Sequence, residues 1–394
     1  MNTKKHSKDS WLYIEPYVYT HIVKDSLFMY NTLDGNSIYC KDKIVIEIIR
    51  KLKKKEFCGV ISIDFDQLCE ENINHFIIEL RDKYMGDVVA KDYSSKKPIQ
   101  IMPYYNYPKY TQISHRNNFN IKSNILENIH EINIELNNNT NIPSLSNFLS
   151  FVPKNVMINI TLNTKINNRL ISFINLLDFP KTYKSVYYII DKTFDFLNKS
   201  DLLHIYVKLP IDHNIFKQKI DMLTNNKFNY DIIFQVSSNN NISELDFIIN
   251  KYNILNYKIE PYYDNNIDFF KKYVFLTEDD ILSSPIKLKD IFLNKSVNIF
   301  DYGIIRIKDN GDIYANEHFP KLGNISENSI YDVVKKELET GKSWLRIRDY
   351  RPCNQCIYQW LCSSPSDFEL ELGIPNLCHI NLEIKSLLSK EITP

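Results

Sequence analysis

The amino-acid sequence predicts an α/β protein whose central part forms a parallel β-sheet, open or partly closed into a barrel. Two observations lead to this prediction. Strands alternate with helices between residues 96 and 290, and repeated βα units of this kind place successive strands in parallel. The length of 394 residues also exceeds the usual size of about 100 to 200 residues for one domain, so two or three domains are expected.

The central strands and helices follow from hydrophobic periodicity. The segments that predict strands are HEINIEL, NVMINITL, LLHIYVKLP, YDIIFQVS and YKIEPYY. Helical periodicity lies between them in NRLISFINLLDF, IFKQKIDMLTNN and ISELDFIINKYN. Residues 96–290 are therefore predicted to form a parallel sheet that is open or partly closed into a (β/α) barrel.

Residues 1–95 predict a small α+β unit. Apolar and polar residues alternate in WLYIEPYVYTHIVKDSLFMYNTLDGNSIYC around the turn Asp34-Gly35, which favours short antiparallel strands. The helix IVIEIIRKL, the loop FCGVISIDFDQ, the helix NINHFIIELRDKYM and a last strand in GDVVAKD follow. This order of elements indicates a winged-helix-like module.

The segment 291–394 has a third pattern. A hairpin is predicted in IIRIKDNGDIYA with Asn310-Gly311 at its turn. The loop EHFPKLGNISEN and the helix SIYDVVKKELETG come next, and the end of the chain holds four of the seven cysteines. This part is predicted to be a separate, cysteine-containing domain.

Composition excludes several classes of function. Lys+Arg and Asp+Glu are 48 each and the pI is about 7.1, so the charge expected of a general nucleic-acid binder is missing. The sequence has no apolar run of the roughly 18 to 20 residues that cross a bilayer, and no apolar signal region follows MNTKKHSKDSWLYIEP. We therefore expect a cytoplasmic protein with no membrane and no nucleic-acid partner.

The cysteines Cys353, Cys356, Cys362 and Cys378 give the spacing C-x2-C-x5-C-x15-C. In a reducing cytosol such a group favours a metal site over disulfides. Four thiolates suit zinc or a four-iron four-sulfur cluster, and the spacing leaves both open. The preceding Arg346, Arg348 and Arg351 either stabilise thiolates or only solvate a helix end. The remaining cysteines, Cys40, Cys58 and Cys69, lack metal spacing and are expected to be buried as small apolar residues.

The tail resembles the SPASM domain, the auxiliary-cluster domain of radical SAM enzymes that modify ribosomally made peptides. The matching segments are NGDIYAN, KLGNISENSIYDVV and the Arg-Pro-Cys-x-x-Cys that follows, in the order of that family. The resemblance implies that Cys353, Cys356, Cys362 and Cys378 bind its second auxiliary cluster. His318 and His379 are lone histidines that are more often structural, although either is able to replace a ligand.

The ligands of the family's first auxiliary cluster are missing. The first has no counterpart between Thr277 and Gly311, the second falls on Asn316 and the third on Ser366. The resemblance therefore implies that this chain holds one auxiliary cluster instead of two.

The C-x3-C-x2-C motif that binds the catalytic cluster of radical SAM enzymes is also missing. Between Cys69 and Cys353 the sequence has no cysteine, and the loop QIMPYYNYPKYTQISHRNN offers only His115. Reductive cleavage of S-adenosylmethionine requires that cluster. The chain, including IEPYYDNNIDFFKKYVFLTEDDIL, thus resembles the pseudo-radical-SAM proteins encoded beside radical SAM peptide maturases in Bacteroidales.

This resemblance implies an accessory role in peptide maturation. The module at residues 10–93 is similar to elements that bind a precursor's leader as an added strand. The resemblance also implies that residues 96–290 form a degenerate, partial (β/α) barrel, which would dock to a genuine radical SAM/SPASM maturase. The alternatives are a non-radical peptide-modifying enzyme, a zinc-stabilised binding protein unrelated to peptide modification, and a module that merely caps the barrel.

Overall fold

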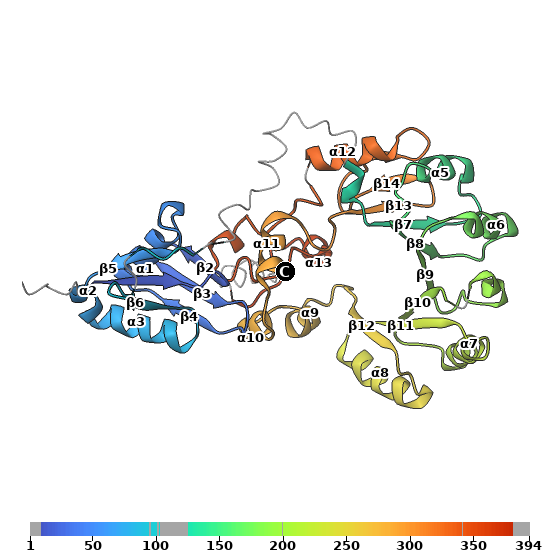
Figure 1. Cartoon of the computed structure of the whole chain (residues 1–394). Helices are drawn as coiled ribbons and strands as arrows, with labels where there is room; N and C mark the ends of the chain where they lie inside the picture. Colours follow the sequence, from blue (N-terminus) through green and yellow to red (C-terminus); the bar gives the residue numbers. More distant parts are fainter. Residues whose placement is uncertain are drawn as a thin grey trace, which may run out of the picture.

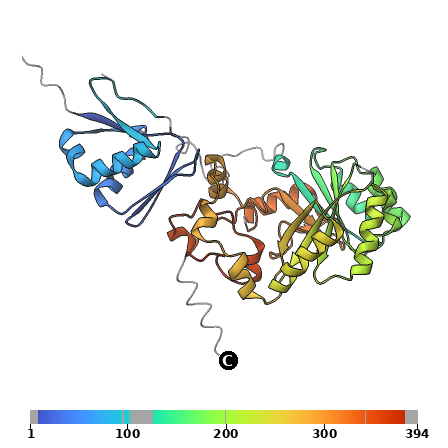
Figure 2. The same ribbon diagram turned by 90° about the horizontal axis from the view of Figure 1, so that it is seen from below.

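The structure is a computed structural model that describes residues 9–93, 96–100, 102, 125–198, 200–340 and 342–380. Three parts follow one another across the molecule. The N-terminal module lies at one end, the cysteine segment lies in the middle, and a curved sheet lies at the other end (Figures 1 and 2). The predicted loop containing His115 falls outside the described residues.

The N-terminal module contains two three-stranded sheets, ordered β5-β1-β6 and β2-β3-β4. The strands are β1 (Ser10–Ile14), β2 (Val18–Val23), β3 (Ser26–Asn31), β4 (Ser37–Cys40), β5 (Val60–Ile63) and β6 (Gly86–Ala90). The helices are α1 (Lys43–Leu52), η1 (Lys55–Phe57), α2 (Phe65–Cys69) and α3 (Glu71–Asp82). The predicted hairpin at Asp34-Gly35 is confirmed, since β3 and β4 pair around it and Gly35 has φ +83.

One element of this module was predicted wrongly. The segment FCGVISIDFDQ was expected to be a loop, but its residues Val60–Ile63 form β5, which pairs antiparallel with β1. Three of these four residues are buried, because the strand packs against the apolar faces of α1 and α3. The winged-helix character itself stays a prediction.

A nine-stranded, mostly parallel sheet dominates the rest of the chain, in the order β12-β11-β10-β9-β8-β7-β13-β14-β15. Its parallel strands include β7 (Glu131–Leu136), β8 (Met157–Leu162), β9 (Lys181–Val186), β10 (Leu202–Lys208), β11 (Asn229–Val236) and β12 (Tyr257–Pro261). Between them lie α5 (Ile142–Leu149), α6 (Asn168–Leu176), η4 (Lys192–Phe196), α7 (His213–Asn225) and α8 (Asn239–Tyr252), after η3 (Ile125–Asn128). From β7 to β12 successive strands are neighbours, and the helices lie on the outer, convex side (Figure 1). This winding in one direction gives a partial barrel.

The two faces of the sheet differ in chemistry. On β7 the residues Ile132, Ile134 and Leu136 are buried in the main core beneath the helices. The alternate residues Glu131 and Glu135 point to the concave face, because side chains alternate along a strand. The concave side is therefore the polar side.

The hairpin of the C-terminal part joins this same sheet. Its strands are β13 (Ile304–Ile307), β14 (Asp312–Tyr314) and β15 (Gly323–Asn324), followed by α12 (Ile330–Thr340). The predicted turn is confirmed, with Gly311 at φ +85, and β13 pairs in parallel with β7. The sheet thus continues across the predicted boundary at residue 291.

The cysteine segment contacts the N-terminal module. Around it lie α9 (Ile267–Tyr273), α10 (Glu278–Leu282), α11 (Leu288–Ser296), η5 (Cys353–Gln355) and α13 (Asp367–Glu371). One apolar cluster joins Tyr19, Phe28 and Tyr30 of the module to Ile281, Ile291, Tyr358, Trp360 and Leu361. In the part of the chain that the structure describes, no helix is both long and apolar enough to span a membrane.

Candidate metal centre

The four predicted ligands come together in one pocket. Cys353 begins η5, Cys356 directly follows it, Cys362 lies in the next turn, and Cys378 returns from beyond α13. The pocket is lined by these four cysteines together with Leu276, Arg348, Gln359, Asn376 and Leu377. The four cysteines thus line one pocket, and their role as metal ligands stays a prediction.

Backbone hydrogen bonds hold the cysteines in place. The N–H of Cys356 donates to the carbonyl of Cys353 at 3.0 Å, and the N–H of Cys362 donates to the carbonyl of Tyr358 at 3.1 Å. Cys378 forms a parallel bridge with Leu276, about a hundred residues earlier in the chain. This bridge fixes the fourth cysteine opposite the first three.

Several N–H groups donate to the sulfur atoms. Asn376 Nδ2 lies 3.5 Å and Arg348 Nη1 lies 3.7 Å from Sγ of Cys353. The backbone N–H of Ile380 donates to Sγ of Cys378 at 3.3 Å. Hydrogen bonds of this kind stabilise thiolate sulfur and tune the potential of iron–sulfur clusters.

Arg348 is the buried cation of the site. It is 6% exposed, and its Nη1 lies 2.9 Å from Oε1 of Glu369, which is 3% exposed. Its Nε also donates to the carbonyl of Ser363 at 2.6 Å. Glu369 neutralises much of the positive charge, so Arg348 orients the cysteine loop and adds a donor to Cys353 at the same time.

Burial disfavours free thiolates in this pocket. It raises the pKa of Cys356 to about 11 and the pKa of Cys362 to about 12. Buried thiols of this kind become thiolates when a metal supplies the positive charge.

Four thiols line the pocket. Among the residues that the structure describes, no group of three or more His, Cys, Asp and Glu side chains stands at a spacing suited to one metal ion. A four-iron cluster takes one cysteine per iron, whereas a structural zinc ion draws all four sulfur atoms to about 2.3 Å from one point. Four cysteine donors suit either a zinc ion or a four-iron four-sulfur cluster.

The other predicted residues lie elsewhere. Arg351 is exposed, so Arg348 alone among the three arginines lines the pocket. His379 Nε2 lies 2.7 Å from the carbonyl oxygen of Lys271, and His318 lies 3.9 Å from Glu371. Neither histidine lines the pocket.

The remaining cysteines lie in the N-terminal module. Cys40 and Cys58 are partly buried, and Cys69 is exposed. The predicted burial is therefore wrong for Cys69, because it ends the short helix α2, none of whose residues is fully buried.

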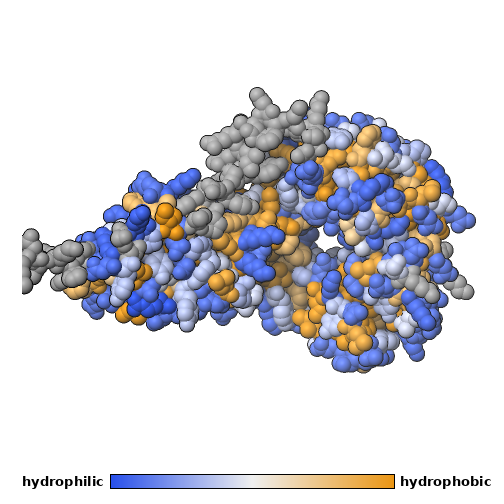
Figure 3. Space-filling model, in the orientation of Figure 1, coloured by the Kyte–Doolittle hydropathy of each residue, from blue (hydrophilic) through white to orange (hydrophobic). Residues whose placement is uncertain are grey.

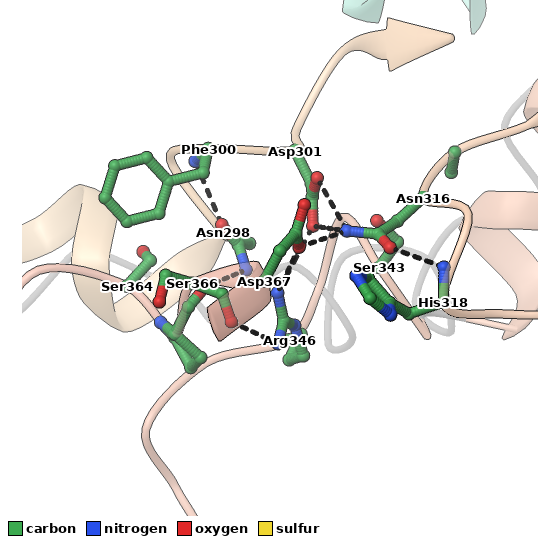
Figure 4. A network of polar contacts seen from close by, with 12 residues as sticks. Asn298, Phe300, Asp301, Asn316, His318, Ser343, Arg346, Ser364, Ser366 and Asp367 are labelled. Carbon is green, nitrogen blue, oxygen red and sulfur yellow. Dashed lines mark hydrogen bonds and ion pairs between the residues drawn. The ribbon is translucent and has the colours of Figure 1, made fainter. Parts of the chain in front are cut away.

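Asn316 and Ser366, which the resemblance assigns to the first auxiliary cluster, lie in one polar network (Figure 4). Asn316 Nδ2 donates to Asp301 Oδ2 at 3.0 Å and to Asp367 Oδ1 at 2.5 Å. Arg346 Nη1 donates to the carbonyl of Ser366 at 3.1 Å, and its Nη2 lies 3.3 Å from Asp367 Oδ1. Asp301 is 1% exposed, so side-chain polar contacts occupy this part of the domain.

Comparisons with known proteins give one weak similarity. No protein-family model matches the chain, and no curated protein matches it. Among solved structures, native anSMEcpe with bound AdoMet and Kp18Cys peptide is 10% identical, with a TM-score of 0.40 over 59% of this chain and 88% of that chain. Native anSMEcpe with bound AdoMet is 12% identical at the same TM-score and coverage. A TM-score of 0.40 does not establish a common fold.

Sequence reasoning missed the polar residues that complete the pocket. Gln359 donates from Nε2 to the carbonyl of Arg348 at 2.5 Å and closes the loop between the cysteines. Asn376 was not singled out either, although it stands two residues before Cys378. Each of these polar residues lies within three positions of a cysteine in the sequence, and this proximity could have identified them as pocket residues.

A second candidate site lies on the N-terminal module. Among the strands that the structure describes, β5 ends its sheet, and beside it lies a groove lined by Ile48, Lys51, Phe57, Ile61, Ser62, Ile63 and Gln67. The N–H of Ile14 donates to the carbonyl of Gly59, so Val60 and Ser62 direct their backbone groups away from β1. The N–H of Gln100 donates to the carbonyl of Cys58 on this side at 2.9 Å, and beyond that point the strand edge beside apolar side chains is of the kind that accepts an added peptide strand.

A third pocket lies on the concave face of the large sheet, with Glu131, Asn133, Lys184, Arg306 and Lys308 among its lining residues. Lys184 Nζ donates to Asn133 Oδ1 at 3.2 Å, and burial lowers the pKa of Lys184. This pocket is polar and holds both signs of charge.

Proposed function

We propose that this protein is an accessory component of ribosomal peptide maturation that holds one four-iron four-sulfur cluster and does not itself cleave S-adenosylmethionine. The observation that carries the proposal is the convergence of Cys353, Cys356, Cys362 and Cys378 on one pocket with N–H donors at sulfur. A cluster bound there would supply a rigid cross-link and a one-electron redox centre. The chain supplies its ligands, the Arg348–Glu369 pair and the apolar cover.

The meeting of Asn316 and Ser366 supports the SPASM-like interpretation. These positions are 50 residues apart in the sequence, and the resemblance assigns both to one lost cluster. Both now contact the Arg346–Asp367 pair. Loss of a cluster with polar replacement at its ligand positions is consistent with a chain that kept one auxiliary site.

The proposed precursor site is the groove between β5 and α1. An extended peptide would accept and donate hydrogen bonds at Val60 and Ser62, while Ile48 and Phe57 contact its side chains. The genuine radical SAM/SPASM maturase is the proposed second partner, and it would supply the chemistry.

Metal analysis tests the cluster. Protein purified without oxygen is expected to contain about four iron and four sulfide ions per chain. Cys356→Ala should remove most of the iron, whereas Cys58→Ala, outside the pocket, should keep it. One zinc per chain in place of iron would support the zinc-stabilised binding protein instead.

Co-purification tests the partners. A tagged chain expressed in its own cell is expected to retain a short ribosomal peptide and a radical SAM enzyme, both identified by mass spectrometry. Ser62→Pro removes an outward N–H without removing a bond to β1, so it should release the peptide and leave the iron content unchanged. Cleavage of S-adenosylmethionine by the isolated protein would contradict the accessory role.

The concave pocket favours a second candidate, a non-radical peptide-modifying enzyme. Lys184 is partly buried, and its lowered pKa increases the fraction of neutral amine that is able to act as a general base or nucleophile. Modification of the peptide by this chain with the maturase omitted, and its loss in Lys184→Met, would favour this candidate over the accessory role.

A further inference from the structure

Strand β12 is an open edge of the nine-stranded sheet. Among the strands that the structure describes, β12 ends the order and pairs with β11 on one side only. Its residues Tyr257, Lys258, Ile259 and Glu260 are all exposed. Such an edge presents unpaired N–H and C=O groups to another chain.

The edge also carries exposed apolar side chains. Leu255 is 82%, Tyr257 is 41% and Ile259 is 55% exposed. They occupy alternate positions at and just before the strand, and Figure 3 shows hydrophobic surface where α8 and β12 lie. Three such residues within five positions favour burial against a partner.

The hydrogen bonds to β11 show which backbone groups face outward. The N–H of Ile232 donates to the carbonyl of Asn256, and the N–H of Tyr262 donates to the carbonyl of Val236. The backbone groups of even-numbered residues therefore point to β11. Those of Tyr257 and Ile259 point to the open side, because the direction alternates along a strand.

We propose that two copies of this chain form a symmetric dimer in which the β12 strands pair antiparallel, with the two-fold axis at Ile259. In this register the two Ile259 residues exchange both N–H···O bonds, and the N–H of Tyr257 donates to the carbonyl of Pro261 of the second copy. Pro261 has no N–H, so the pairing ends there. The partner is a second copy, independently of the proposed function.

Charge complementarity selects this partner. With Ile259 at the axis, Lys258 lies opposite Glu260 of the second copy, and Glu260 lies opposite Lys258. Opposite charges across antiparallel strands are stabilising, and like charges are destabilising. Lys258 lies 3.6 Å from Asp231 in its own chain, but its side chain is 67% exposed and remains accessible to the second copy.

Charge reversal tests the dimer. The full chain is expected to sediment as a dimer, with Lys258→Glu and Glu260→Lys each weakening association about tenfold or more, since both cross-strand pairs become repulsive. The control Lys217→Glu reverses an exposed charge on α7 and should leave the dimer intact.

Mixing the two variants tests the register. A chain with lysine at 258 and 260 complements a chain with glutamate at both positions, so the mixture should form a heterodimer. A wild-type chain that stays monomeric at high concentration, a dimer insensitive to both reversals, or a mixture that stays monomeric would each overturn the proposal.

Discussion

At the scale of single residues, the cysteine pocket depends on a buried ion pair. Arg348 and Glu369 are almost fully buried and lie 2.9 Å apart. Removing one partner of such a pair leaves the other charge without compensation, which costs more than the pair itself contributes. Arg348 is therefore a positioning residue whose loss affects the fold and the metal site together.

Arg348→Met is expected to lower the free energy of unfolding by about 3–5 kcal/mol, because Glu369 loses its counter-ion. The double variant Arg348→Met/Glu369→Gln should recover a large part of that loss, since no charge remains unpaired. Urea unfolding of all three proteins checks this. Equal stability of the single variant and the wild type would contradict the role given to the pair.

Asn316→Ala is expected to cost about 1–3 kcal/mol, because Asp301 and Asp367 lose a buried donor. The control Asn147→Ala changes an exposed residue on α5 and should stay within about 0.5 kcal/mol of the wild type. Thermal unfolding compares the two. A cost at Asn316 as small as at Asn147 would show that the network contributes nothing.

At the scale of elements, sequence predicted those with a clear period. Strands β7, β8, β10, β11 and β12 and helices α6, α7 and α8 were all predicted, because their apolar residues repeat regularly. Strand β9, with the sequence KTYKSV, was missed. Its only large buried residue is Tyr183, so its strand character comes from pairing with β8 and β10.

In the cysteine pocket, too, some residues were predictable from the sequence and others depend on the tertiary fold. Its four cysteines were predictable because thiol spacing reflects metal chemistry directly. The donors Arg348 and Asn376 were less predictable, because their contacts with Cys353 depend on how the loop folds back over η5. The polar replacement at Asn316 was predicted only as the absence of a ligand.

Alanine substitutions at two glycines with positive φ compare the cost of backbone strain alone with the cost of strain plus steric overlap. Gly303 has φ +77, and a Cβ there would stand 2.3 Å from the carbonyl of Asn128, whereas Gly373 has φ +64 and no atom within 4 Å of its Cβ position. Gly373→Ala is expected to cost about 1–2 kcal/mol. Gly303→Ala should cost about 1–3 kcal/mol more, because the start of β13 is forced away from β7. Equal losses in urea unfolding would contradict this.

At the scale of the whole molecule, the N-terminal module covers the cysteine segment. The rings of Phe28 and Tyr358 pack edge to face, with their centroids 5.0 Å apart. The N–H of Ile286 donates to the hydroxyl of Tyr30 at 2.9 Å. Peptide recognition and metal binding would therefore be mechanically connected in the proposed function. The connection runs through the β2-β3-β4 sheet.

Phe28→Ala is expected to speed the loss of metal to a chelator, because it opens the cover over the cysteine segment. The control Phe76→Ala removes a ring of similar burial from the module's own core and should destabilise the module without the same effect on metal release. The rate of metal release to the chelator, measured by absorbance, distinguishes the two variants. Equal release rates in both variants would show that the module does not protect the site.

The pairing of β7 with β13 has a consequence for synthesis on the ribosome. Ile304 stands beside Glu131, so about 170 residues are made after β7 before its neighbour exists. At about 5–20 residues per second, β7 waits roughly ten to thirty seconds with one side open. During that time the nascent chain exposes an unpaired strand edge of the kind that β12 presents before a second copy binds, and such edges favour aggregation.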